Sequence, residues 1–124
     1  MKIYESAENY LERILMLKEK TEKVRSIDIA EDMDFTKASV SRAMKNLKEN
    51  NLITIDKDGF IDLTSEGLKI AKSILERHRL LTKFLIDLGV PDDIAAKDAC
   101  KIEHDLSDES FKAIKNHFKI IKAK

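Results

Sequence analysis

The sequence contains one cysteine, one proline, three glycines and no tryptophan. A single cysteine cannot form an internal disulfide, which excludes a disulfide-stabilised secreted domain. With so few glycines and prolines, there is little room for a glycine-rich phosphate-binding loop or for the many turns of an all-β fold. The sequence has neither the run of about 18 apolar residues that predicts a transmembrane helix nor a signal-peptide core. These absences predict a helical protein of the cytoplasm.

Charge, by contrast, is abundant, because 37% of the 124 residues are charged. The 23 basic and 23 acidic side chains cancel, so the net charge neither favours nor excludes nucleic acid as a partner. The local distribution is more informative. The segment 37–48 contains the basic residues Lys37, Arg42, Lys45 and Lys48 and no acidic residue. Basic side chains gathered on one segment are typical of a protein that contacts phosphate groups.

Apolar residues at helical spacing predict three helices in the first half of the chain, at about 6–20, 27–33 and 37–50. Ser26 precedes the second of these and is expected to cap it. The third helix would bury its apolar face and leave polar and basic residues outside, namely Lys37, Ser41, Arg42, Lys45 and Lys48. On the helices alone, an ordinary helical hairpin with a solvated lysine face remains an alternative.

Two β-type runs follow, at 52–56 and 60–63, and the turn 57–59 between them predicts a hairpin. A short helix, a tight turn, a longer basic helix and a hairpin are typical of a winged helix-turn-helix, whose second helix enters the major groove of DNA. We therefore predict a DNA-binding domain over residues 1–64 with a two-stranded wing.

The second half of the chain predicts three more helices. Ser65 is expected to cap a long helix that Gly89 ends, a second helix runs over about 91–105, and Ser107 caps the last. Their apolar faces exceed what a small neighbouring module could cover, so we expect some of this surface to meet a second copy of the chain. Residues 65–124 are thus predicted to form a helical dimerisation domain.

This second half also concentrates side chains that bind metals. Cys100, Glu103 and His104 are spaced to share one face of a helix, while His78 and Glu12 could add donors from two other helices. Mixed N, O and S donors suit a first-row divalent ion rather than calcium or magnesium, and a closed tetrahedral zinc site is the competing interpretation. Considered one at a time, these residues have simpler interpretations. Cys100 could be a small buried apolar residue, His104 an ordinary surface or core histidine, and Glu12 part of a solvated polar edge of the first helix. A Cys–His nucleophile pair is disfavoured because no third, orienting group is apparent, so we expect no enzyme.

Several short motifs in a fixed order carry a resemblance to a known family. They are Ser6-Ala-Glu-Asn-Tyr-Leu-Glu-Arg, Ser39-Val-Ser, Leu63-Thr-Ser-Glu-Gly, Arg77-His-Arg-Leu-Leu and Cys100-Lys-Ile-Glu-His. From about Glu5 to Phe118 the chain resembles the diphtheria toxin repressor and manganese transport regulator family of metal-dependent transcriptional repressors. The resemblance implies a mainly α fold, in which a winged helix-turn-helix is followed by a helical metal-binding and dimerisation domain, and a homodimer on palindromic operator DNA.

Carried onto this sequence, the family's main metal site falls on Asn9, Glu12, His78, Cys100, Glu103 and His104. Together with outward residues of the predicted third helix and wing, the resemblance gives these expected DNA contacts: Arg25, Thr36, Lys37, Ser39, Ser41, Arg42, Lys45 and Lys57. Cys100 is similar to the iron-responsive branch, whereas the short chain is similar to the manganese regulator. Asn9 departs from both branches, and Thr82 and Ala96 replace ligands of a second, ancillary site.

The prediction is a metal-dependent DNA-binding regulator that senses iron(II) or manganese(II). The thiolate of Cys100 favours iron(II), and zinc or another divalent transition metal is an alternative. Two other functions remain open from the sequence: a winged-helix regulator that responds to an organic ligand, and a metal-free winged-helix module that binds a protein.

Overall fold

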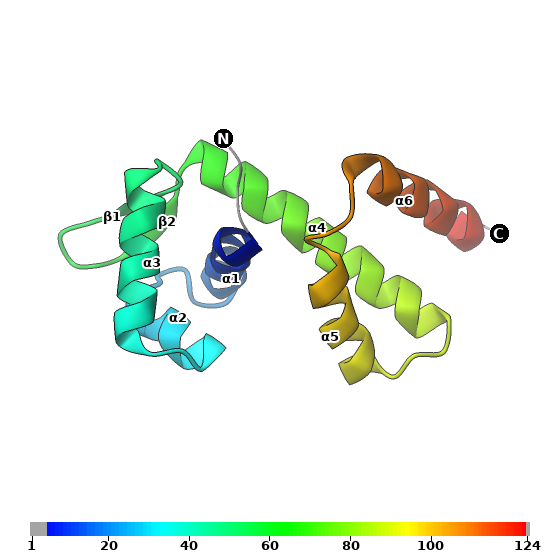
Figure 1. Cartoon of the computed structure of the whole chain (residues 1–124), viewed down its shortest axis with the longest axis horizontal. Helices are drawn as coiled ribbons and strands as arrows, with labels where there is room; N and C mark the ends of the chain where they lie inside the picture. Colours follow the sequence, from blue (N-terminus) through cyan, green and yellow to red (C-terminus); the bar gives the residue numbers. More distant parts are fainter. Residues whose placement is uncertain (1–4, 124) are drawn as a thin grey trace. The chain divides into compact units, whose positions relative to one another are not determined.

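The computed structural model describes residues 5–123, which form six helices and one two-stranded antiparallel sheet (Figure 1). The elements in chain order are α1 (Glu5–Thr21), α2 (Ser26–Met33), α3 (Lys37–Glu49), β1 (Ile53–Ile55), β2 (Ile61–Leu63), α4 (Ser65–Asp87), α5 (Asp92–Ile102) and α6 (Asp108–Ala123). The predicted mainly α fold with a two-stranded wing is confirmed. Among the described residues, no helix is long and apolar enough to cross a membrane.

The chain divides into two compact units, Met1–Ser73 and Ile74–Lys124. The division falls inside α4, so this helix contributes to both units. The first unit holds the helix-turn-helix and the wing, and the second holds the rest of α4 with α5 and α6. The domain boundary predicted between residues 64 and 65 stays a prediction; α4 begins at Ser65, and the two compact units divide after Ser73.

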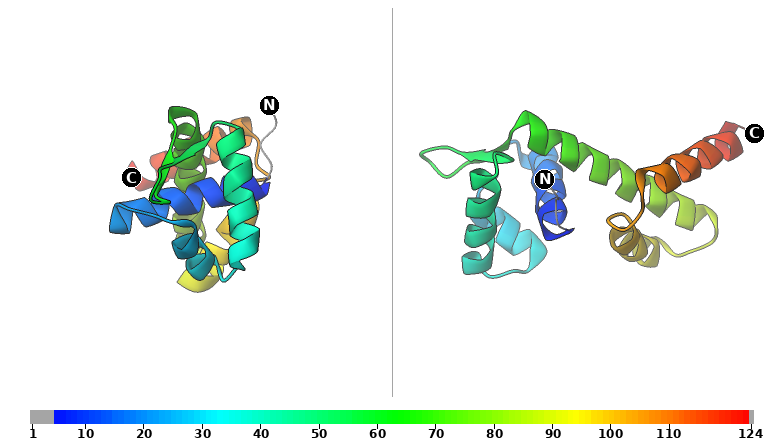
Figure 2. Two further views of the ribbon diagram at one scale, coloured as in Figure 1. Left: turned by 90° about the vertical axis from the view of Figure 1, so that its left-hand side faces the viewer. Right: turned by 45° about the horizontal axis from the view of Figure 1, so that its top comes forward.

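In the first unit, three helices and the hairpin enclose one apolar core. Its fully buried side chains come from every element of the unit and include Leu11, Ile29, Met44 and Ile53. The strands pair with Ile55 opposite Ile61, and the loop between them projects beyond α3 (Figure 2). Helical spacing of apolar residues on α1, α2 and α3 buries one face of each helix and leaves the polar face in water.

Two polar contacts join the wing to the last turns of α1 and to the segment that follows this helix. The backbone N–H of Ile61 donates to the carbonyl oxygen of Val24 at 2.7 Å, which adds Val24 to the edge of the sheet. Lys18 Nζ lies 2.8 Å from Asp62 Oδ1, and this hydrogen bond lowers the pKa of the Asp62 carboxyl. The wing is therefore held at its base.

The start of α4 differs from the predicted one, because Thr64 rather than Ser65 is the cap. The hydroxyl of Thr64 accepts a hydrogen bond from the backbone N–H of Gly67 at 3.1 Å and donates to the carbonyl oxygen of Asn51 at 2.8 Å. Gly67 packs so tightly against Leu52, the residue before β1, that a Cβ built on it would lie 2.0 Å from the carbonyl oxygen of Leu52. Because of this close approach, position 67 has no room for a side chain.

The prediction that Ser26 caps α2 is also wrong by one position. Ser26 is the first residue of the helix, and Arg25 occupies the cap position before it. The backbone N–H of Arg25 donates to the carboxylate of Asp28 at 2.9 Å, so the acidic side chain of the first turn satisfies the donor.

In the second unit, the predicted helix ends are partly confirmed. Gly89 follows α4 with a φ of 108°, and its N–H donates to the carbonyl oxygen of Ile86 at 2.9 Å. The hydroxyl of Ser107 accepts from the N–H of Ser110 at 3.1 Å, which confirms it as the cap of α6. The helix predicted to reach residue 105 instead ends at Ile102. That earlier end changes where the candidate metal donors lie.

Candidate metal centre and nucleic-acid interface

The outer face of α3 presents the basic side chains that the sequence predicted for DNA. Val40, Met44 and Leu47 face the core, which leaves the other side of the helix in solvent. Seven of the eight predicted DNA contacts are exposed and only Ser39 is half-buried; the exposed ones are Arg25, Thr36, Lys37, Ser41, Arg42, Lys45 and Lys57. An exposed helix face with lysine and arginine is the surface that a recognition helix offers to a major groove.

Two of these residues also shape the start of α3. Thr36 is its cap, and the hydroxyl of Thr36 accepts from the N–H of Ser39 at 3.1 Å and donates to the Ser39 hydroxyl at 2.9 Å. The two hydroxyls therefore have a structural task that is independent of any DNA contact.

Beside Arg25, the structure places two residues that the sequence did not single out, Lys23 and Phe60. The guanidinium of Arg25 lies 4.3 Å from the ring centroid of Phe60, and Lys23 Nζ lies 5.1 Å from the same centroid. The negative face of an aromatic ring attracts both cations. Since Phe60 is more than thirty positions downstream, no local pattern in the sequence pointed to this arrangement.

The second unit brings three of the predicted metal donors together: the imidazoles of His78 and His104 lie beside the carboxylate of Glu103. Glu103 is 0% exposed, its Oε2 lies 2.9 Å from His78 Nδ1 and its Oε1 lies 3.3 Å from His104 Nε2. The His104 side chain is 1% exposed, and Cys100 is half-buried on the last turn of α5. Two imidazoles thus converge on a carboxylate that water does not reach.

The path of the backbone differs from the single helix face that the spacing suggested. Glu103 is the C-cap residue that follows Ile102, and its N–H donates to the carbonyl oxygen of Ala99 at 2.9 Å. His104 lies in the turn after the helix. Cys100 therefore lies on α5 itself, whereas His104 lies in the turn that follows the helix, so the two residues do not share one helix face.

The other two predicted ligands, Asn9 and Glu12, belong to α1 in the first unit. Asn9 is half-buried and Glu12 is 5% exposed. The simple interpretation of Glu12 as part of a solvated polar edge is therefore wrong. The assignment of both residues to the metal site stays a prediction.

The donors of the second unit fit a divalent transition-metal ion. Burying a carboxylate is costly unless positive charge compensates it, and a divalent cation supplies such charge. Imidazole nitrogen, carboxylate oxygen and thiol sulfur are donors that first-row metals accept. At the ancillary positions, by contrast, Thr82 donates its hydroxyl to the carbonyl oxygen of His78 at 2.6 Å, and Ala96 carries no donor.

The fold and the donor cluster together define a class: a winged helix-turn-helix protein with a metal-binding helical unit. Residues 2–60 match the family described as the iron dependent repressor, N-terminal DNA binding domain. Residues 64–122 match the iron dependent repressor, metal binding and dimerisation domain. The chain belongs to the iron-dependent repressor family, which confirms the predicted family and the predicted metal-dependent, DNA-binding transcriptional regulator.

Individual relatives agree with this assignment. The chain is 37% identical over 102 residues to the HTH-type transcriptional regulator MntR of Shouchella clausii, and the aligned region covers 82% of this chain and 71% of that protein. It is 30% identical over 108 residues to the diphtheria toxin repressor of Corynebacterium jeikeium, covering 86% of this chain and 45% of the repressor. A solved manganese-dependent transcriptional repressor in complex with manganese is 30% identical, with a TM-score of 0.82, and 90% of this chain matches 51% of that one. The chain spans about half the length of these last two proteins.

Proposed function

We propose that this protein is a cytoplasmic, homodimeric sensor of manganese(II) or iron(II) that binds a palindromic operator when the metal is bound. The observation that carries the proposal is the fully buried Glu103 carboxylate in contact with the imidazoles of His78 and His104. Such a cluster suits a regulator better than an enzyme, because nothing in it resembles an activated nucleophile with an orienting partner.

In this proposal, His78, Cys100, Glu103 and His104 hold the ion, and the family resemblance adds Asn9 and Glu12 from α1. A divalent ion supplies the positive charge that the Glu103 carboxylate needs in its buried position. Because the ligands come from both units, metal occupancy would favour one arrangement of the winged helix in the dimer and thereby DNA binding. Half-sites one helical turn apart, at about 34 Å, are the spacing that two recognition helices of a dimer read.

The choice between the two metals depends on Cys100. A soft thiolate favours iron(II), whereas the similarity to the solved manganese-dependent repressor favours manganese. Zinc or another divalent transition metal is the remaining candidate.

Exposed apolar residues of the second unit support the proposed homodimer. Leu88 is 67% exposed and Ile94 48%, and Ile86 and Ile102 are each 37% exposed. Apolar side chains in these numbers on a small helical unit are typical of a surface that a partner covers.

The test of this function is operator binding with and without metal. The apparent affinity for operator DNA, measured by fluorescence anisotropy, is expected to rise about 5- to 150-fold when manganese(II) or iron(II) is added, and to fall back with a chelator. Random DNA of the same length controls for nonspecific phosphate binding. Equal operator affinity in metal and in chelator would refute the sensor and favour the metal-free or organic-ligand alternatives.

The basic face of α3 gives a second prediction. Arg42→Ala is expected to weaken operator binding by about 1–3 kcal/mol if the guanidinium makes a bidentate contact with a base, and to leave binding to random DNA nearly unchanged. Lys45→Ala is the matched control from the same face, since loss of a phosphate contact should weaken both DNAs equally. An Arg42→Ala protein that still prefers its operator as strongly as the wild type would exclude base reading by this residue.

A further inference from the structure

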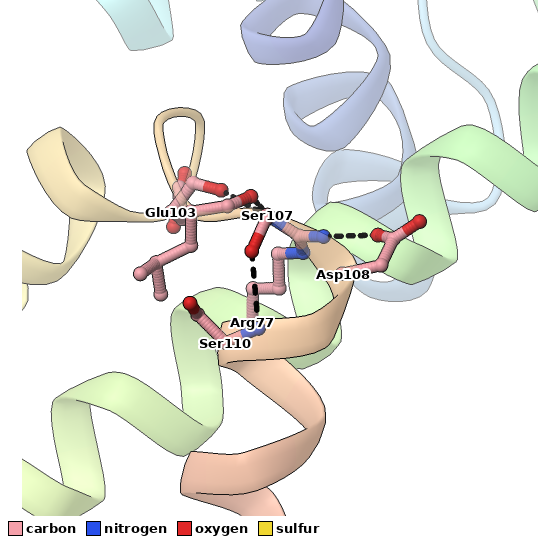
Figure 3. A network of polar contacts seen from close by, with 6 residues as sticks. Arg77, Glu103, Ser107, Asp108 and Ser110 are labelled. Atoms are coloured by element: carbon pink, nitrogen blue, oxygen red, sulfur yellow. Dashed lines mark hydrogen bonds and ion pairs between the residues drawn. The ribbon is translucent and has the colours of Figure 1, made fainter.

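Arg77 carries a buried positive charge beside the metal centre that the proposed function does not use. Its side chain is only 8% exposed. The guanidinium donates from Nη1 to the carbonyl oxygens of Glu103 at 3.1 Å and Leu106 at 2.6 Å, and from Nη2 to the carboxylate of Asp108 at 2.5 Å (Figure 3). It also lies 5.2 Å from the ring centroid of Phe111. One side chain of α4 therefore binds two backbone carbonyls of the segment between α5 and α6 and two side chains of α6.

These contacts supply hydrogen-bond donors to carbonyl groups at the C-terminal end of α5. The last carbonyl groups of a helix lack partners within the helix and carry partial negative charge. Glu103 is the C-cap of α5, so the guanidinium of Arg77 binds where that negative charge gathers. Asp108 contributes less, because its side chain is 86% exposed and the charge pair is screened on that side. The carbonyl contacts are thus the part of the network that orders the turn.

Arg77 and His78 are consecutive residues, and they hold Glu103 from its two ends. His78 contacts the carboxylate, whereas Arg77 binds the backbone carbonyl of the same residue. A carboxylate whose backbone is fixed at one point loses little freedom when it binds an ion, which is the advantage of a preorganised ligand.

We propose that Arg77 is a positioning residue of the metal centre. It fixes the backbone of Glu103, and hence of the adjacent His104, so that the carboxylate remains between the two imidazoles. The inference rests on the proposed metal-sensing function, and it adds a residue that need not touch the ion.

The chain offers a matched control for this role. Lys115 Nζ lies 2.8 Å from Glu76 Oε1, which joins α4 to α6 as the Arg77–Asp108 pair does. Glu76 is exposed and immediately precedes Arg77, but the hydrogen bond between Lys115 and Glu76 does not involve a candidate ligand. Substituting Lys115 tests whether the loss of any polar contact between α4 and α6 affects metal binding.

The experiment compares the full-length wild type, Arg77→Met, Arg77→Lys and Lys115→Met. Manganese(II) affinity is measured by calorimetry, ligand geometry by the visible absorption spectrum of the cobalt(II) form, and folding by thermal unfolding of the metal-free protein. Arg77→Met is expected to weaken manganese(II) binding about 10- to 100-fold and to alter the cobalt(II) spectrum. Arg77→Lys should recover part of this loss, because an ammonium keeps the charge but not the planar fork of donors. Lys115→Met should behave like the wild type in affinity and spectrum.

The outcomes separate the two proposals. A folded wild type that binds neither manganese(II), iron(II) nor cobalt(II) refutes the proposed function. A wild type that binds metal, with Arg77→Met unchanged in affinity and spectrum, overturns the positioning role alone. Equal losses in Arg77→Met and Lys115→Met would show that general packing of α4 on α6 is responsible, and would overturn it too.

Should Arg77→Met fail to fold, Arg77→Lys decides the question. Hydrogen exchange of the amides at 103–108 is then expected to be faster than in the metal-free wild type, while exchange near Ile114 on α6 stays the same. This change should accompany weaker manganese(II) binding. Unchanged exchange in the turn together with unchanged affinity would overturn the inference.

Discussion

Glu103→Gln is expected to lower the affinity for manganese(II) or iron(II) by more than about 100-fold, which exceeds the loss typical of residues that only support a ligand. The reason is that Glu103 supplies the buried carboxylate that both imidazoles contact, and an amide of the same shape carries no charge for the ion. Calorimetric metal titration measures this loss directly. In the operator assay, the variant should bind DNA as the wild type does in the presence of a chelator.

The same substitution should leave the metal-free protein folded. Glutamine fills the same volume, its side chain can still form a hydrogen bond with His78 Nδ1, and a neutral amide avoids the cost of burying a carboxylate without an ion. Asp105→Asn, an exposed carboxylate in the same turn, is the control and should bind metal normally. A Glu103→Gln protein that is unfolded without metal would show that the carboxylate serves the fold. Undiminished metal affinity would exclude it as a ligand.

Gly67→Ala is expected to destabilise the first unit by roughly 1–3 kcal/mol or more, as overpacking of a tight contact does. Alanine is the better helix former by about 1 kcal/mol, so helix propensity alone predicts the opposite sign. The contact decides, because the new Cβ would lie 2.0 Å from the carbonyl oxygen of Leu52, and a backbone atom cannot rotate away. The shift of β1 would also disturb the Thr64 cap, whose N–H donates to the same oxygen at 3.1 Å.

Urea unfolding measures this prediction through the free energy of unfolding in water. Ser73→Ala, at an exposed position of the same helix, is the control and should be neutral or slightly stabilising. A Gly67→Ala protein as stable as that control would mean that α4 moves away from β1 without cost, and the explanation of the glycine in the Leu63-Thr-Ser-Glu-Gly motif would be wrong.

Local patterns predicted the elements better than their ends. The three helices of the first unit and the hairpin follow from apolar spacing and a turn, which depend on neighbours within a few residues. The caps at Ser26 and Ser65 were each placed one residue late, because serine is a common cap but Arg25 and Thr64 are the residues with the required partners. A cap depends on the geometry of the preceding loop, which the sequence does not display.

The candidate metal centre shows the same division. Its candidate donor residues were predicted from their chemistry and from the family resemblance, and the structure places Glu103 between His78 and His104. The end of α5 at Ile102 was missed, and with it the role of the turn that carries His104. Arg77 was missed as well, since an arginine in an amphipathic helix normally points to water.

By itself, the sequence determined the helical class, the winged helix-turn-helix, the family and the donor types, because these follow from residue spacing and from motifs in order. Only the tertiary structure decided how far Glu103 is buried, that Arg77 binds its carbonyl, that Gly67 touches Leu52 and that Phe60 attracts Arg25. Each of these contacts joins residues at least fifteen positions apart. Their pairing depends on where helices end and how side chains pack, and close packing is a property of the folded chain rather than of any segment.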